Sequence, residues 1–426
     1  MKFGIIDSEG LIMTNRSVYR SAGQKEDTSG IAKRVAQIEV SAIKQMPLLA
    51  SKVEGCVSLG QGVPSFATPP FICEAVIEGL RTNDTIGQYS LQPGVPELKI
   101  EIAKRLQQRK GIPVNPEKEV FVSCGAMEAI AAGIATIIER GDEVLLPSPN
   151  YASHIEQILF AEGKPIFVPC LEDKGWNLDI ESFKRAITPK TKAILICCPM
   201  NPTGAVFSEQ ELKAIAQIAI DNNLYLIADE AYDFLVYDNL SYFSLASIPE
   251  LKNNLIATYS FSKMYCMTGW RVGYMYASAR IINQVLKVHD AFAICAPTIS
   301  QYAALAALKA TDGKGGEGNK FIQQLVETLG SRRNIICQRL DNLHHVFSYQ
   351  KPKGTYYIFP KIMLEGTNSM DLALRLLYEA KVITIPGNGF GPTGEGHIRL
   401  SYGGTEEEIN KAFDRIDEWA KRYRTV

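Results

Sequence analysis

Between residues 71 and 300, short apolar segments alternate with segments of helical periodicity. The apolar segments are rich in β-forming residues and bounded by glycine or proline, which is typical of buried strands. They read EVFVSC, EVLLPS, KPIFVPC, AILICCP, YLIADEA, LIATYSFS and VGYMYAS, and the helical segments include FICEAVIEGLRT, PELKIEIAKRLQQR, AMEAIAAGIATIIER and SEQELKAIAQIAIDN. Strands that alternate with helices predict an α/β fold with a largely parallel sheet covered on both faces.

The length of 426 residues suits two domains, or one large domain with a smaller partner. A helical pattern begins at Ile31, and VSLGQGVPSFATPP then indicates a short strand followed by turns. Near the C-terminus, the segments TYYIFPK, VITIPG and HIRLSY indicate strands of a smaller α+β unit that ends in a helix. We therefore predict an extension (1–30), the N-terminal part of a small domain (31–70), a large domain (71–320), and the C-terminal part of the small domain with a long connecting helix (321–426).

Composition narrows the function classes. Hydrophobic residues make up 46% and charged residues 21% of the chain, as in soluble globular proteins. The net charge of -1 gives no electrostatic reason to expect nucleic acid or a membrane surface as partner. The nine cysteines are scattered without metal-ligand spacing, so we expect no metal site. The N-terminus does not resemble a signal peptide, so we expect a cytoplasmic enzyme.

Polar and aromatic residues follow the predicted strands at the points where the strands end. In open α/β sheets, ligands bind at the carboxyl ends of the strands. These side chains are therefore predicted to converge on one rim of the sheet: Gly125, Ala126, Met127, Tyr151, Asn201, Asp229, Tyr232, Ser260, Ser262 and Lys263.

Two of these groups suit a phosphate. Residues 125–127 open a helix, where unpaired backbone N–H groups and the helix dipole favour an anion. Ser260, Ser262 and Arg271 offer two hydroxyls and a fork of N–H donors. Each group has an ordinary alternative: a strand-to-helix turn for the first, and a solvated turn with a surface arginine for the second.

The remaining groups suit an aromatic aldehyde with a basic ring nitrogen. Asp229 follows an apolar run, and a buried carboxylate needs a cationic or donor partner, either a protonated pyridine or a structural ion pair. Desolvation and nearby positive charge would lower the pKa of Lys263 and make it nucleophilic. Tyr151 is either a stacking ring or a core aromatic, and His154 either orients Asp229 or is an ordinary polar group. Pyridoxal phosphate (PLP) carries the phosphate, the ring nitrogen and the aldehyde together.

At this point the chain resembles the class I/II aminotransferases, the aspartate-aminotransferase-like fold-type I PLP enzymes. The resemblance covers residue 31 to the C-terminus and rests on ordered motifs: GQGVPSFATPP, YSLQPGVPELK, GAMEA, NPTG, DEAYDF, SFSKMYCMTGWRVGY and HIRLSY. It implies a large domain with a mostly parallel seven-stranded sheet between helices, and a smaller α+β domain.

The resemblance also implies roles for individual residues. Lys263 matches the Schiff-base lysine that shuttles a proton, and Asp229 the partner of the pyridine nitrogen. Tyr232 and Asn201 match the donors to the phenolic oxygen of the cofactor, and Tyr151 the ring that stacks on it. The phosphate site matches Ser260, Ser262, Arg271 and the turn from Gly125 to Met127. Tyr89 matches a tyrosine that reaches the phosphate site of the neighbouring subunit, which implies a homodimer with shared active sites. Arg399 matches the arginine that binds the substrate carboxylate, and Asn201 and Gly62 help it.

The implied reaction is transfer of an amino group between an L-amino acid and a 2-oxo acid. Met127 stands where some dicarboxylate-specific members have a lysine, and Glu128 suits either a neutral or basic substrate or a helix-start acid. Two alternatives use the same motifs. One is a PLP-dependent lyase or cyclase of specialised metabolism, such as one that cyclises hydroxyarginine to an enduracididine- or capreomycidine-like product; the other is a non-catalytic sensor domain.

Overall fold

The computed structural model describes residues 4–6, 12–14, 29–38, 42–313 and 315–423. The chain divides into two compact units, residues 1–39 and residues 40–426. In the first unit, β1 (Gly4–Ile6) and β2 (Ile12–Thr14) form an antiparallel hairpin, and α2 spans Lys33–Ala36. Most of the predicted extension lies outside the described residues. The predicted boundaries at residues 70 and 320 fall inside the second unit and stay a prediction.

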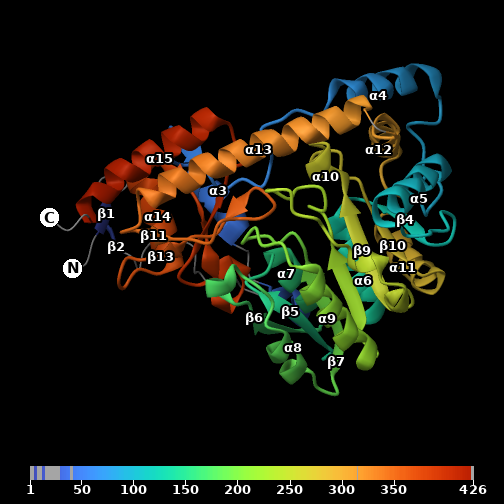
Figure 1. Cartoon of the computed structure of the whole chain (residues 1–426), viewed down its shortest axis with the longest axis horizontal. Coiled ribbons are helices and arrows are strands. Elements are labelled where there is room, and N and C mark those ends of the chain that lie inside the picture. Colours follow the sequence, from blue (N-terminus) through green and yellow to red (C-terminus); the bar gives the residue numbers. More distant parts are fainter. Residues whose placement is uncertain (1–3, 7–11, 15–28, 39–41, 314, 424–426) are drawn as a thin grey trace. The chain divides into compact units, whose positions relative to one another are not determined.

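The second unit contains a seven-stranded sheet, as the family resemblance implied, and each predicted apolar segment forms one of its strands (Figure 1). Its strand order is β4-β10-β9-β8-β7-β5-β6. Neighbouring strands from β9 to β6 run parallel, whereas β10 is antiparallel to both β9 and β4, so the sheet is mostly parallel as expected. The strands are β4 (Val120–Ser123), β5 (Glu143–Ser148), β6 (Lys164–Pro169), β7 (Thr191–Cys197), β8 (Tyr225–Asp229), β9 (Leu255–Ser260) and β10 (Gly273–Ala277).

Helices connect these strands and bury them. One buried apolar cluster packs α6 and α11 against the sheet through residues such as Ile130, Ile256 and Ile282. The helices of this region are α4 (Pro70–Thr82), α5 (Pro96–Lys110), α6 (Ala126–Ile137), α7 (Ala152–Phe160), α8 (Ile180–Ala186), α9 (Glu209–Asp221), α10 (Phe261–Met264), α11 (Ala279–Phe292) and α12 (Thr298–Ala310). The helix α3 (Ala42–Ala50) instead lies against β14 (Val382–Ile383) and β15 (Ile385–Pro386). None of the helices that the structure describes is long and apolar enough to cross a lipid bilayer.

A second core lies under α13 (Glu317–Asp341), α14 (Ser369–Ala380) and α15 (Glu406–Ala420), which Figure 1 shows in orange to red. A capping box of Thr405 and Glu408 starts α15. The short strands of this region are β3 (Val57–Ser58), β11 (Phe347–Ser348), β12 (Tyr357–Ile358), β13 (Lys361–Ile362), β14 (Val382–Ile383), β15 (Ile385–Pro386) and β16 (Ile398–Ser401). Because β3 pairs with β14, residues before the large sheet join the C-terminal strands.

Candidate active site

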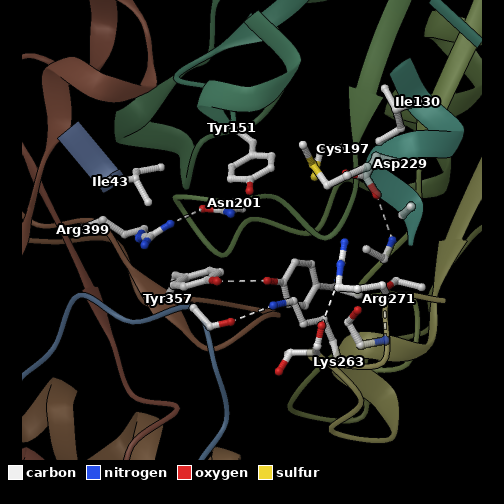
Figure 2. A pocket seen from close by; sticks show the side chains of 18 residues that line it. Ile43, Ile130, Tyr151, Cys197, Asn201, Asp229, Lys263, Arg271, Tyr357 and Arg399 are labelled. Carbon is white, nitrogen blue, oxygen red and sulfur yellow. Dashed lines mark hydrogen bonds between the residues drawn. The ribbon is translucent and has the colours of Figure 1, made fainter. Parts of the chain in front are cut away.

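One cavity of about 260 Å³ lies where the carboxyl ends of the large-sheet strands meet β16 and the segment after β3. Figure 2 shows Arg399 and Ile43 at one end of the view and Asp229, Ile130 and Arg271 at the other. The cavity brings together most of the predicted site residues: Gly62, Ala126, Met127, Tyr151, Asn201, Asp229, Tyr232, Ser260, Ser262, Lys263, Arg271 and Arg399. The structure therefore gathers residues that lie more than 300 positions apart in the sequence.

The anion-suited end is the start of α6. Gly125 caps this helix with φ of +81°, in the left-handed region that favours glycine. A Cβ atom at this position would lie 2.6 Å from Nη2 of Arg271, so the arginine is packed directly against the turn. The first-turn amides of Ala126 and Met127 belong to a helix that has no side-chain cap. This end of the cavity therefore combines a helix N-terminus with a guanidinium group.

The serines of the same end come from the turn between β9 and α10. Ser260 Oγ accepts a 3.1 Å hydrogen bond from the backbone N–H of Ser262, which fixes the first turn of the short helix. Nη1 of Arg271 donates to the carbonyl of Thr268 at 2.9 Å, and Thr268 also lines the cavity. Both serines and the arginine therefore face one space, as the sequence predicted.

Asp229 is a buried carboxylate at the end of β8. Its Oδ2 lies 3.0 Å from Nε2 of His154, and its Oδ1 accepts from the backbone N–H of Ala231 at 3.1 Å. The other ring nitrogen of His154 lies 2.8 Å from Oδ1 of Asn150, whose Nδ2 donates to the carbonyl of Pro147. The amide thus presents an acceptor to the ring, which fixes the imidazole. Of the two readings of His154, the structure supports the one in which it orients Asp229.

A buried ion-pair group holds the segment after Asp229. Nζ of Lys110, on α5, lies 2.7 Å from Oε2 of Glu230 and 2.9 Å from Oδ2 of Asp233. These two carboxylates flank Tyr232, which lines the cavity. Breaking such a buried group by removing one partner is strongly destabilising, so Lys110 fixes the path of the chain around Tyr232.

Lys263 projects from α10 into the cavity, and its Nζ donates a 2.6 Å hydrogen bond to the carbonyl of Gly62. Burial lowers the pKa of its ammonium group, and the positive charges of Arg399 and Arg271 lower it further. The lowered pKa increases the fraction of neutral, nucleophilic amine at a given pH, as expected from the sequence.

Arg399, on β16, is 2% exposed, and its guanidinium lies close to two aromatic rings. Its Cζ lies 4.4 Å from the ring centroid of Tyr357 and 5.1 Å from that of Phe390. Nη1 donates to Oδ1 of Asn201 at 3.1 Å, and Nη2 donates to the carbonyl of Gly60 at 2.9 Å. Among the described residues, nothing accepts a hydrogen bond from its Nε. A buried guanidinium with a spare donor suits a carboxylate ligand.

Three expectations fall outside the cavity. Gly125 precedes the lining residues Ala126 and Met127 but does not itself line the cavity. Tyr89 is 78% exposed and is not among the residues that line it. Glu128 also does not line it, because its carboxylate accepts a 2.5 Å hydrogen bond from the backbone N–H of Cys124 and pairs with His289. Glu128 is therefore a helix-start acid with a local partner, the second of its two readings.

Sequence reasoning missed Tyr357, Ile43, Cys197 and Thr268, all of which line the cavity. Tyr232 donates a 3.0 Å hydrogen bond to the hydroxyl of Tyr357 (Figure 2). The only sequence signal for Tyr357 was the aromatic pair in TYYIFPK, which reads equally well as part of an apolar strand. Ile43 carries no polar group, so no chemical pattern marked it.

Comparisons with known proteins agree with this geometry. Residues 54–416 match the family model described as aminotransferase class I and II. The chain is 34% identical to aromatic-amino-acid aminotransferase 2 of Thermococcus litoralis, over 93% of this chain and 100% of the relative. It is 35% identical to an aspartate aminotransferase of Pyrococcus abyssi, over 90% of this chain and 97% of the relative.

Solved structures show the same fold. The aromatic aminotransferase of Pyrococcus horikoshii OT3 superposes with a TM-score of 0.83 at 34% identity, covering 90% of this chain and 100% of that one. The aspartate aminotransferase of Thermus thermophilus with maleate superposes with a TM-score of 0.85 at 31% identity, covering 91% and 99%. The fold is thus that of the fold-type I transferases, and this chain belongs to the class I and II aminotransferase family.

Proposed function

We propose that this aminotransferase holds PLP in the described cavity and moves an amino group between an L-amino acid with a neutral side chain and a 2-oxo acid. One observation carries the proposal. The buried amine of Lys263, whose pKa is lowered, shares the cavity with the carboxylate of Asp229, the phosphate-suited turn and the guanidinium of Arg399. An amine, a carboxylate, an anion site and a carboxylate clamp are the four groups that this chemistry needs.

The residues present fit the cofactor. Ser260, Ser262, Arg271 and the α6 amides would hold its phosphate, and Asp229 its ring nitrogen. Tyr232 and Asn201 would donate to its phenolic oxygen, and Tyr151 would stack on the ring. When bound, PLP supplies an aldehyde that bonds to amines and a ring that withdraws electrons from the substrate α-carbon.

The chain's own side chains then have distinct tasks. Arg399 binds the substrate carboxylate and so fixes the direction of the bond from the α-carbon to its hydrogen. Lys263 takes the proton from the α-carbon on Nζ and returns it to the product side, which its lowered pKa favours. Asp229, held by His154, keeps a proton on the ring nitrogen. The rings of Tyr357 and Phe390 exclude water from the guanidinium of Arg399.

A neutral substrate side chain follows from the charges that line the cavity. The positive groups there are Lys263, Arg271 and Arg399, and each already has a task. Met127 and Ile43 are apolar, and Figure 2 shows Ile43 beside Arg399, where the substrate would lie. Within the described residues of one chain, the cavity thus offers no further cation to a second carboxylate, which supports a neutral side chain over an aspartate-like one.

We also propose a homodimer in which Tyr89 reaches the partner's phosphate site. The exposure of Tyr89 and its absence from the cavity of its own chain support this role. Sedimentation of the purified protein would test the dimer. The cytoplasmic location stays a prediction.

The experiment is a single-turnover screen of the purified protein with bound PLP against neutral, acidic and basic amino acids, with products identified by mass. Stoichiometric formation of the aminated cofactor and the oxo acid of a neutral amino acid supports the proposal. Turnover confined to aspartate and glutamate would contradict the substrate class. An altered amino acid without an oxo acid would instead indicate the lyase or cyclase reaction.

A further inference from the structure

The helix α6 begins with only half of a capping box. At the start of α15 the box is complete: the Thr405 hydroxyl accepts from the backbone N–H of Glu408 at 3.2 Å, and the Glu408 carboxylate accepts from that of Thr405 at 2.8 Å. Glu128 holds the same third position in α6, but the residue before the helix is Gly125. Because glycine has no side chain, it offers no oxygen to the first-turn amides of α6, while the glutamate of the box is still present.

The carboxylate of Glu128 turns back along the chain and does not line the cavity. Its Oε2 accepts the backbone N–H of Cys124 at 2.5 Å, one residue earlier than Glu408 reaches in α15. The N–H of Gly125 has another acceptor, since it donates to the carbonyl of Ser123 at 2.8 Å. The bond from Cys124 to Glu128 therefore fixes the chain just before the turn into α6.

A second contact holds the carboxylate in that direction. Oε1 of Glu128 pairs with Nδ1 of His289, which lies on α11 and is fully buried, and the His289 ring packs edge-on against Phe121 of β4 with centroids 4.6 Å apart. Burial alone would raise the pKa of Glu128, but the contacts with His289 and Cys124 hold it below its ordinary value. The carboxylate is therefore charged at neutral pH, and both of its oxygens have fixed partners.

The residue that Glu128 holds also meets the phosphate-suited end of the cavity. The carbonyl of Cys124 accepts a 3.5 Å hydrogen bond from Nη2 of Arg271. The next residue, Gly125, turns the chain at φ of +81° into the amides of Ala126 and Met127. Two of the groups expected to bind the phosphate thus depend on the conformation of Cys124, which Glu128 fixes at its N–H.

We propose that Glu128 is a positioning residue: its carboxylate, held by His289, fixes Cys124 so that the first-turn amides of α6 and the guanidinium of Arg271 face the cofactor phosphate. The inference rests on the proposed function. Glu128 supplies the half of the cap that stabilises the turn, and glycine at the cap position leaves the amide donors to the anion. Since both oxygens of Glu128 are bound to other partners, its carboxylate does not compete with the phosphate for these donors.

The test compares the binding of PLP with that of pyridoxal, which has the same ring and aldehyde but no phosphate, to the full-length protein freed of cofactor. Equilibrium dialysis gives both dissociation constants. Glu128→Ala is expected to weaken PLP binding about 5- to 30-fold, the range that loss of a helix cap gives, and pyridoxal binding less than about twofold. Glu128→Gln should stay within about twofold of the wild type for both ligands, because its amide oxygen still accepts from Cys124 and its N–H₂ faces His289.

A second variant tests the other end of the contact. His289→Phe keeps a buried ring beside Phe121 and retains Glu128, and Nε2 of His289 has no partner among the described residues, so the contact with Glu128 is the one that is lost. Its preference for PLP over pyridoxal is expected to fall about 2- to 10-fold. This variant decides the question if Glu128→Ala does not fold, and an unchanged preference in it would overturn the proposal.

A matched control is Glu408→Ala. It removes the third-position glutamate of the α15 capping box, and Glu408 does not line the cavity. Its affinities for PLP and pyridoxal are expected to match those of the wild type. A similar loss of the preference for PLP in this control would mean that loosening any helix cap changes the cofactor site, and the specific role of Glu128 would be wrong.

The ratio of the two affinities separates the outcomes. An unchanged preference for PLP in Glu128→Ala overturns the proposal, whether both affinities stay or fall together, because an equal fall shows a general loss of structure. Tighter PLP binding in that variant would show that the carboxylate repels the phosphate, and a Glu128→Gln protein as weak as Glu128→Ala would show that charge and not the bond to Cys124 matters; either result overturns it. A wild-type protein that binds neither ligand would refute the proposed function itself, whereas one that binds both equally would refute the phosphate site.

Discussion

Replacing Arg399 with lysine keeps a positive charge in the cavity but removes the forked donor. The guanidinium has five N–H donors and gives one each to Asn201 and Gly60, so three remain for a ligand, the Nε–H among them. A lysine at this position can keep at most one bond to a substrate carboxylate where arginine makes two. Losing one charge-assisted hydrogen bond costs about 1.5–3 kcal/mol. The value of kcat/KM for an amino acid is therefore expected to fall about 10- to 150-fold.

The assay compares an amino acid with the amine that lacks its carboxylate, each in the half-reaction that consumes the PLP form. If Arg399 binds the carboxylate, Arg399→Lys slows the amino acid by the stated factor and the amine by less than about threefold. Arg339→Lys is the control, because Arg339 pairs with Asp414 and Asp417 between α13 and α15 and does not line the cavity. Equal losses for both substrates, or no loss for the amino acid, would refute the clamp.

Three further changes test other parts of the site. Lys263→Ala is expected to abolish turnover and the covalent link to PLP, measured by mass after reduction; any residual normal turnover would contradict the role of the lysine. Because burial and nearby positive charges lower the pKa of Lys263, the cofactor-free native state binds fewer protons than the unfolded chain between that lowered pKa and 10.5. Its unfolding free energy should therefore rise with pH in this window, and denaturant titrations should show a smaller rise in Lys263→Ala. Gly125→Ala should weaken PLP binding at least about tenfold. The control is Gly141→Ala, which is also at positive φ but has open space around the added Cβ, and it should bind PLP normally in a dialysis assay. Lys110→Met removes the cation from the buried carboxylate of Glu230 and the partly buried one of Asp233, and should cost about 3–5 kcal/mol in urea unfolding. The exposed Lys104→Met should cost at most about 1 kcal/mol, and similar costs for the two variants would refute a buried ion-pair role.

Much of the large sheet could be predicted because its signals are local. Each apolar segment became a strand, and residues at the strand ends, such as Asp229 and Lys263, line one cavity. A parallel sheet brings the carboxyl ends of its strands to one edge whatever the details of packing, so position after a strand is enough to place a side chain near the site.

The order of the strands in the sheet could not be predicted from the apolar segments of the sequence. In the structure β5 lies between β7 and β6, and β10 inserts between β9 and β4 in the opposite direction. These neighbours are set by long-range crossover connections, which no window of sequence contains. Motif spacing therefore predicted which residues converge but not how they are arranged.

The sequence by itself determined the family, and it predicted the cofactor-suited set of residues with Lys263 among them, because each depends on residue types at fixed places along strand and turn. The tertiary structure alone decided the partners of those residues. It stacks Tyr357 on Arg399, directs Glu128 to His289, and joins Tyr232 to Tyr357 by a hydrogen bond. Each of these pairs is separated by more than 40 positions, so its geometry comes from how β12, β16 and the helices pack. Local pattern supplies the chemical groups, and packing decides which of them share a proton or a charge.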